Sequence, residues 1–258
     1  MKDKASVLFL ILGGFFITNA IMAEFVGVKI FSLEQSLGLQ PINLSLFGIQ
    51  NLSFNLTAGT LMWPLVFIMT DIINEYFGKR GVRFLSFFAV IMIGYAYVMV
   101  AAAMSLVPAD FWIMRETATG MINMDVAYNA IFSQGLWIII GSIIAFLVGQ
   151  LIDVFVFQFV KRKTGERHIW LRATGSTLIS QFIDSFVVLA IAFGLGAGWS
   201  IELIMAIAVV NYIYKFTIAL ILTPLLYLVH NVIDRFLGKE LSIKLQSEAM
   251  ENSNNGIF

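Results

Sequence analysis

The sequence contains no cysteine and only two histidines. Without cysteine, disulfides, thiolate catalysis and cysteine-ligated zinc or iron–sulfur sites are excluded together. Charge is also scarce: 12% of the residues are Asp, Glu, Lys or Arg, against about 25% in an ordinary soluble domain. The formal net charge is +0, so no overall field favours nucleic acid, and we expect no nucleic-acid partner.

The chain is instead rich in hydrophobic residues, which occur in long stretches. Hydrophobic residues make up 59% of its 258 positions, and the mean hydropathy is +0.89. A helix that crosses a bilayer core needs roughly 20 such residues. We therefore predict an all-α membrane protein with six transmembrane helices in the lipid bilayer. Their approximate ranges are 6–31, 58–77, 82–106, 130–160, 174–197 and 201–230.

The distribution of basic residues predicts the orientation of these helices. Most of the 16 Lys and Arg residues fall before the first helix, between the second and third, between the fourth and fifth, and after the sixth. Lys and Arg beside a membrane helix are retained in the cytoplasm. Both termini should therefore be cytoplasmic, in a multi-pass protein of the cell (inner) membrane.

Residues 1–239 are predicted to form one six-span transmembrane domain. Residues 240–258 lack an obvious apolar period, and we expect a disordered cytoplasmic tail. On the outer side, apolar and polar residues alternate near 42–57 around Gly48. This period of two predicts a short β-hairpin, with an ordered loop as the alternative.

Polar side chains recur inside four of the predicted helices at spacings of three or four residues, which place them on one face of each helix. A charge at a helix centre costs about 2.5–3.5 kcal/mol on insertion scales, so such residues are functional candidates. Together the four stripes predict a shared internal cavity. The stripes are Asp71, Asn74 and Glu75; Gln150 and Asp153; Ser180, Gln181 and Asp184; and Asn211 and Lys215.

Two of these charges fall near the middle of their helices. An ion pair between Asp184 and Lys215 would neutralise both, either within a binding site or purely as structural support. Glu75 lies near the Gly78-Lys79 end of its helix, where interfacial charges are ordinary. For Glu75 and Asn74 we therefore expect a coupling or structural role. No metal-ligand spacing is present around His168 and His230, and we expect no metal, no cofactor and no enzyme activity.

Several motifs occur in order along the chain: Trp63-Pro64, Thr70-Asp71, Glu75, Gly78, Gly149-Gln150, Asp153, Arg172, Ser176-Thr177, Gln181, Asp184, Tyr214-Lys215 and Thr223-Pro224. This combination, over about residues 58–238, resembles the bacterial queuosine precursor transporters, also described as vitamin uptake transporters. The resemblance implies import of a 7-deazaguanine base such as preQ0 or preQ1 for salvage into tRNA modification. Within it, Arg172 joins Glu75 and Asn74 as a coupling or structural residue.

The candidate residues suit such a base. A guanine-type ring presents N1–H and an exocyclic amine, which one carboxylate, Asp184 or Asp153, could accept together. Asp71 and Lys215 could share in recognition of the base. Amides offer both donors and acceptors to the rest of the ring edge, and aromatic rings can stack on its face. The amide candidates are Gln150, Gln181 and Asn211, and the favoured aromatic candidates are Trp63 and Tyr214.

Two mechanisms remain open at this stage. The chain could transport alone, with Asp153 as the favoured carboxylate if a proton drives uptake. Alternatively, the family resembles the six-helix substrate-binding subunits of energy-coupling-factor transporters, so the chain could pass its ligand to an ATPase module. No Walker-type phosphate loop is present in the sequence, so that ATPase would be a separate chain. A homodimer is also compatible with the sequence.

Overall fold

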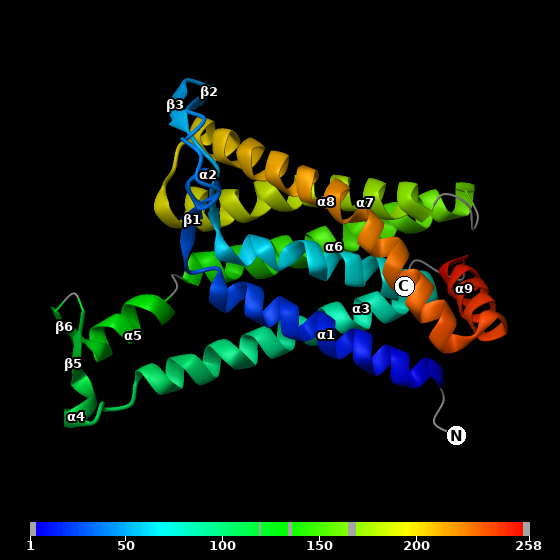
Figure 1. Ribbon diagram of the computed structural model, residues 1–258, viewed down its shortest axis with the longest axis horizontal. Helices are drawn as coiled ribbons and strands as arrows, with labels where there is room; N and C mark the ends of the chain where they lie inside the picture. The colour runs from blue at the N-terminus through cyan, green and yellow to red at the C-terminus, as the bar shows by residue number, and fades with distance from the viewer. Residues whose placement is uncertain (1–3, 119, 134–135, 165–168, 255–258) are drawn as a thin grey trace.

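The computed structural model describes the backbone of residues 4–118, 120–133, 136–164 and 169–254, and side chains in these ranges except 136–138, 169–174 and 251–254. Long helices make up most of it and pack lengthwise against one another (Figure 1). The long helices are α1 (Lys4–Val26), α3 (Trp63–Met104), α6 (Leu136–Thr164), α7 (Ile169–Leu189), α8 (Ile201–Leu237) and α9 (Lys239–Asn254).

Five helical segments in the described part of the chain are long and apolar enough to cross a membrane. Large apolar side chains such as Leu10, Ile91 and Phe155 are exposed on their surfaces, as helices in contact with lipid require. The chain is thus a multi-pass α-helical membrane protein. The segments are Lys4–Val26, Ala58–Met104, Ile139–Thr164, Gly175–Leu195 and Ile201–Leu237.

The difference between five segments and the six expected helices lies in α3, which contains two of the expected ones. Gly78 interrupts it with φ 66° and ψ −175°, a region that essentially only glycine occupies. In Figure 1 the parts of α3 before and after this residue run in opposite directions. Helix α3 therefore consists of two antiparallel stretches joined at Gly78.

The core lies where α1, both parts of α3, α6 and α8 meet. Phe16, Val66, Ile72 and Ala89 are each fully buried there. Close helix approach elsewhere depends on small residues. A Cβ added to Gly141 of α6 would lie 3.0 Å from the backbone nitrogen of Ala192, in the π-helical turn η2 (Ala190–Leu195) that follows α7.

Two separate groups of short elements lie at the end of the bundle opposite α9 (Figure 1). Strands β2 and β3 form a hairpin whose turn residues Phe47 and Gly48 both have positive φ, as a type I′ turn requires. The end of the segment expected as a hairpin, residues 55–57, is not part of this hairpin, because its strand β4 pairs with β1. The first group is β1 (Ile30–Ser32), α2 (Leu33–Ser36), β2 (Leu44–Leu46), β3 (Ile49–Leu52), β4 (Asn55–Thr57) and η1 (Ala58–Leu61); the second is α4 (Asp110–Ile113), β5 (Met114–Thr117), β6 (Gly120–Asn123) and α5 (Met124–Phe132).

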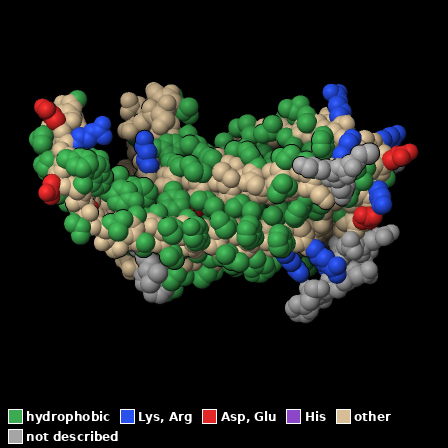
Figure 2. Space-filling view, turned by 90° about the horizontal axis from the view of Figure 1, so that it is seen from below, with side chains coloured by type: hydrophobic (Ala, Val, Ile, Leu, Met, Phe, Trp, Pro, Cys, Tyr) green, Lys and Arg blue, Asp and Glu red, His purple; other side chains and the backbone are tan. Residues whose placement is uncertain are grey.

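Charged side chains gather at the two ends of the molecule, and hydrophobic ones cover the stretch between them (Figure 2). Lys and Arg are concentrated at the end where α1 begins and α9 lies. This arrangement places an apolar band across the middle of the bundle, as a bilayer requires.

Helix α9 occupies residues for which we expected a disordered tail. A spacing of four joins Leu241, Leu245 and Ala249, and the two leucines pack on the core. Ala249 is buried beside Gly78, and the Ser242 hydroxyl donates a 2.6 Å hydrogen bond to Asp234 of α8. The small apolar face of α9 therefore folds against the bundle although most of its residues are polar.

Candidate functional site

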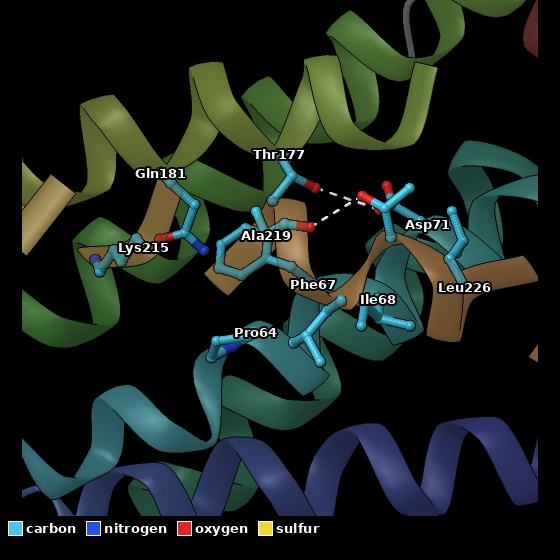
Figure 3. Close-up of a pocket in the computed structure, with 11 residues that line it drawn as sticks. Pro64, Phe67, Ile68, Asp71, Thr177, Gln181, Lys215, Ala219 and Leu226 are labelled. Atoms are coloured by element: carbon cyan, nitrogen blue, oxygen red, sulfur yellow. Dashed lines mark hydrogen bonds between the residues drawn. The ribbon is translucent and has the colours of Figure 1, made fainter. Parts of the chain in front are cut away.

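A pocket lies between the first part of α3, α7 and α8 (Figure 3). Its empty space, including the part open to the surroundings, is about 440 Å³. Three of the predicted site residues line it: Asp71, Gln181 and Lys215. The remaining lining residues are Pro64, Phe67, Ile68, Thr177, Ala219, Leu222, Thr223 and Leu226.

Asp71 is the carboxylate of this pocket. Its side chain is buried at 4% exposure. The hydroxyl of Thr177 donates to Oδ2 at 3.2 Å, and that of Ser176 to Oδ1 at 3.5 Å. Figure 3 shows Thr177 pointing from α7 toward Asp71. Among the side chains that the structure describes, Asp71 is therefore held by hydroxyl groups rather than by a cation.

The expected ion pair between Asp184 and Lys215 is present. Lys215 Nζ lies 2.6 Å from Asp184 Oδ2. Both side chains keep some exposure, 10% for the lysine and 18% for the aspartate. Lys215 lines the pocket, whereas Asp184 lies behind it. Within the residues that the structure describes, the pocket thus has one cation, held in place by an acid outside its lining.

Polar atoms without partners point to capacity for a ligand. Gln181 is 3% exposed, yet its carbonyl oxygen Oε1 accepts no hydrogen bond among the described residues. Buried polar groups are normally paired. An acceptor left open in the lining of a pocket is a position where a ligand N–H could bind.

Asp153 and Gln150 lie deeper, on α6 and outside the pocket lining. Asp153 is fully buried and accepts a 3.1 Å hydrogen bond from Ser180. Gln150 accepts a 3.0 Å hydrogen bond from Thr70. Asp153 Oδ2 and Gln150 Nε2 have no hydrogen-bond partner among the described residues. The polar stripe of α6 therefore faces α3 and α7, outside the lining of this pocket.

A third polar layer lies toward Gly78. The Gln158 amide donates a 2.5 Å hydrogen bond to Asn74 Oδ1. Lys161 pairs with Glu75 at 3.1 Å, with both side chains 1% exposed. Sequence reasoning missed Gln158 and took Lys161 as a loop residue. The sequence pattern that could have identified Lys161 is its spacing of eight residues from Asp153, which continues the polar stripe of α6.

The remaining predicted site residues are not in the described pocket lining. Trp63 packs against Phe146 with ring centroids 5.4 Å apart. Tyr214 is buried, and Asn211 is half-buried. Phe67, which sequence reasoning did not select, supplies the aromatic ring of the lining. Arg172 lies outside the residues whose side chains are described.

The family model described as "Putative vitamin uptake transporter" matches residues 57–229. The chain belongs to this family. The matched stretch contains every residue that lines the pocket and leaves out α1 and α9. Members of the family are transporters rather than enzymes by their names. No solved structure matches the chain significantly.

Curated relatives have more specific names. The chain is 31% identical to the "Probable queuosine precursor transporter" of Bacillus subtilis over 177 residues, covering 67% of this chain and 72% of the relative. It is 29% identical to a relative with the same name from Haemophilus influenzae, covering 75% and 77% of the two chains. It is 28% identical to the "Queuosine precursor transporter" of Escherichia coli, covering 78% and 83%.

Proposed function

We propose that this transporter moves a 7-deazaguanine precursor of queuosine, such as preQ0 or preQ1, into the cell for tRNA modification. The names of the curated relatives supply the substrate class. The observation that carries the proposal is the pocket, because its polar groups match the edge of a guanine-type ring. This chemistry does not depend on the names.

Asp71 would accept N1–H and the exocyclic amine of the base with its two carboxylate oxygens. We favour Asp71 over Asp184 and Asp153 for this role because it is the carboxylate in the described lining. Gln181 would bind another ring group, and Lys215 would donate to the ring carbonyl. Phe67 and Leu222 would contact the flat faces of the base.

We further propose six membrane-spanning helices with both ends of the described chain in the cytoplasm. The reversal at Gly78 supports counting α3 as two spans. The concentration of Lys and Arg at the end of the bundle where α1 begins supports a cytoplasmic location for that end. The hairpin β2–β3 would then lie on the outer face.

The proposal is tested in a bacterial strain that lacks both queuosine precursor synthesis and its own transporter. The chain is expressed there, preQ0, preQ1 or queuine is supplied separately, and queuosine in tRNA is measured. Expression should restore queuosine with preQ0 or preQ1. Asp71→Asn should reduce initial uptake roughly tenfold or more, since a hydrogen bond to a charged group contributes about 1.5–3 kcal/mol.

Asp110→Asn is the matched control, because it makes the same change at an exposed carboxylate in α4. It should leave uptake at the unmodified level. No restored queuosine with any of the three bases, despite normal amounts of protein in the membrane, would refute the proposed function. Restoration in a host without any energy-coupling-factor ATPase would show that the chain acts without that partner.

A further inference from the structure

Asp71 and Asp153 approach each other from two helices across a row of hydroxyl groups on a third. Their exposures are 4% and 0%. Ser176 and Thr177 donate to Asp71, and Ser180 donates to Asp153. Ser176 and Thr177 lie four and three residues before Ser180 on α7, so the two carboxylates meet the same face of that helix about one turn apart.

The neighbouring acids have basic partners, whereas this pair does not. Glu75 is paired with Lys161, and Asp184 with Lys215. No Lys, Arg or His lies within ion-pair distance of Asp71 or Asp153 among the residues described. On α1, Glu24 is bound by hydroxyl groups of Ser142 and Tyr97. Among the described side chains, the buried or half-buried charged groups on the helices around the pair include Glu75 on α3, Lys161 on α6, Asp184 on α7, Lys215 on α8 and Glu24 on α1.

Two adjacent ionised carboxylates cannot both persist in such a place without a compensating cation. A proton bound to one of them would supply this compensation. Asp153 Oδ2 is an open position for it, because this atom is buried and has no hydrogen-bond partner among the described residues. We propose that Asp71 and Asp153 share one proton and that movement of this proton couples substrate uptake to the proton gradient. The inference rests on the proposed function for the identity of the substrate.

The surroundings favour a proton over a sodium ion. Transporter sites for Na⁺ commonly use backbone carbonyls freed where a helix unwinds. The stretches of α3, α6 and α7 that carry these residues are continuous helix, whose carbonyls are already engaged. Two carboxylates and three hydroxyls are sufficient to hold and pass a proton.

Substrate binding would determine which carboxylate holds the proton. Asp71 lines the pocket and Asp153 does not. Accepting two N–H groups requires an ionised Asp71, so a proton present there passes through a hydroxyl of Ser176 or Thr177 to Asp153 Oδ2. The pair keeps one proton and one negative charge throughout this exchange. Once the base has left, Asp153 releases its proton to the cytoplasm. The doubly charged pair is transient, because a proton from the outer side replaces the lost one before the next base binds, which gives one inward proton per base.

The test uses the full-length purified protein in liposomes, with labelled preQ0 as the probe. With one proton per base, an inward gradient of about one pH unit should support up to about tenfold accumulation. Asp153→Asn imitates the protonated carboxyl. It should lose this accumulation while keeping exchange of internal for external preQ0, which requires binding and movement of the base but no net proton flow.

Asp234→Asn is the matched control, since Asp234 is a partly buried carboxylate of α8 bonded to Tyr76 and Ser242. It should keep gradient-driven accumulation. The infrared band of a protonated carboxylic acid provides a readout that needs no substrate. It should be present at neutral pH in the unmodified protein and be reduced in Asp153→Asn but not in Asp234→Asn.

The outcomes separate the two proposals. Exchange of preQ0 without any effect of a pH gradient would overturn the proton pair and leave the proposed function standing. Accumulation driven by a Na⁺ gradient instead would also overturn it. Absence of exchange with both labelled preQ0 and labelled preQ1 in the unmodified protein would refute the proposed function, and the infrared comparison would then decide alone whether the pair holds a proton.

Discussion

The ammonium nitrogen of Lys161 lies 3.1 Å from Oε2 of Glu75, and both side chains are 1% exposed. The same nitrogen donates a 3.2 Å hydrogen bond to the backbone carbonyl of Glu75. This pair joins α6 to α3 one turn before Gly78. It is a buried contact rather than a charge at the membrane surface.

Lys161→Met should destabilise the protein by about 3–5 kcal/mol, the usual loss when one partner of a buried ion pair is removed. Thermal unfolding in detergent measures the change. Lys244→Met is the matched control, since Lys244 pairs with Glu248 on the surface, with exposures of 68% and 51%. Such pairs contribute about 0.2–1 kcal/mol. Equal effects of the two substitutions would contradict the assigned role of Lys161.

Asp184→Asn should lower uptake because it frees Lys215 from its 2.6 Å ion pair and shifts the cation within the pocket. The double variant Asp184→Asn, Lys215→Met removes both charges. It should recover the amount of folded protein in the membrane without recovering uptake of preQ0. Full recovery of uptake would show that the pair only supports the structure.

Gly78→Ala should cost about 1–3 kcal/mol, because an alanine at φ 66° and ψ −175° is strained. Its Cβ would also lie 3.1 Å from the carbonyl oxygen of Ala249. Gly94→Ala is the control, since that glycine is helical and has open space around its Cβ position. Protease sensitivity of α9 should increase in the first variant and stay unchanged in the second. Equal protection of α9 in both variants would contradict the role of the contact between Gly78 and Ala249 in holding α9 to the bundle.

The short segment containing β1 and α2 should loosen in acid. Burial opposes ionisation of Glu34, but the hydrogen bond from the Phe54 amide at 2.9 Å and those of its own backbone outweigh this, and the pKa of Glu34 is lowered. A lowered pKa stabilises the folded form above the unfolded value, near 4.5, and this stabilisation is lost as the pH falls through the folded pKa. The protection factor of the Phe54 amide against hydrogen exchange should fall over that window, and Glu34→Gln should remove this pH dependence.

Periodicity and cost arguments predicted the long apolar helices and three of the residues that line the pocket. An acid or amide inside an apolar helix has few tolerable positions, so the stripes carrying Asp71, Gln181 and Lys215 had to face other helices. Their spacing of three and four residues was sufficient to identify these faces. The Asp184–Lys215 pair followed from charge neutralisation alone.

Other features depend on contacts between distant segments. The tail was expected to be disordered because it lacks an obvious apolar period. Its small apolar face, with Leu241 and Ala249, packs against the bundle, and this contact is not visible in the local sequence. Lys161 was assigned to a loop because a basic residue at a helix end usually marks the cytoplasmic side; its partner Glu75 is not adjacent in sequence. Trp63 packs against Phe146 instead of lining the pocket, and composition cannot distinguish these roles.

The reversal at Gly78 has a consequence for biogenesis. The backbone of Ala249 closes over this glycine, yet Ala249 belongs to α9, which leaves the ribosome only after the five described spanning segments have been made. The bend in α3 therefore stays uncovered until α9 has been synthesised and seals it. Completion of this corner is coupled to the synthesis of α9.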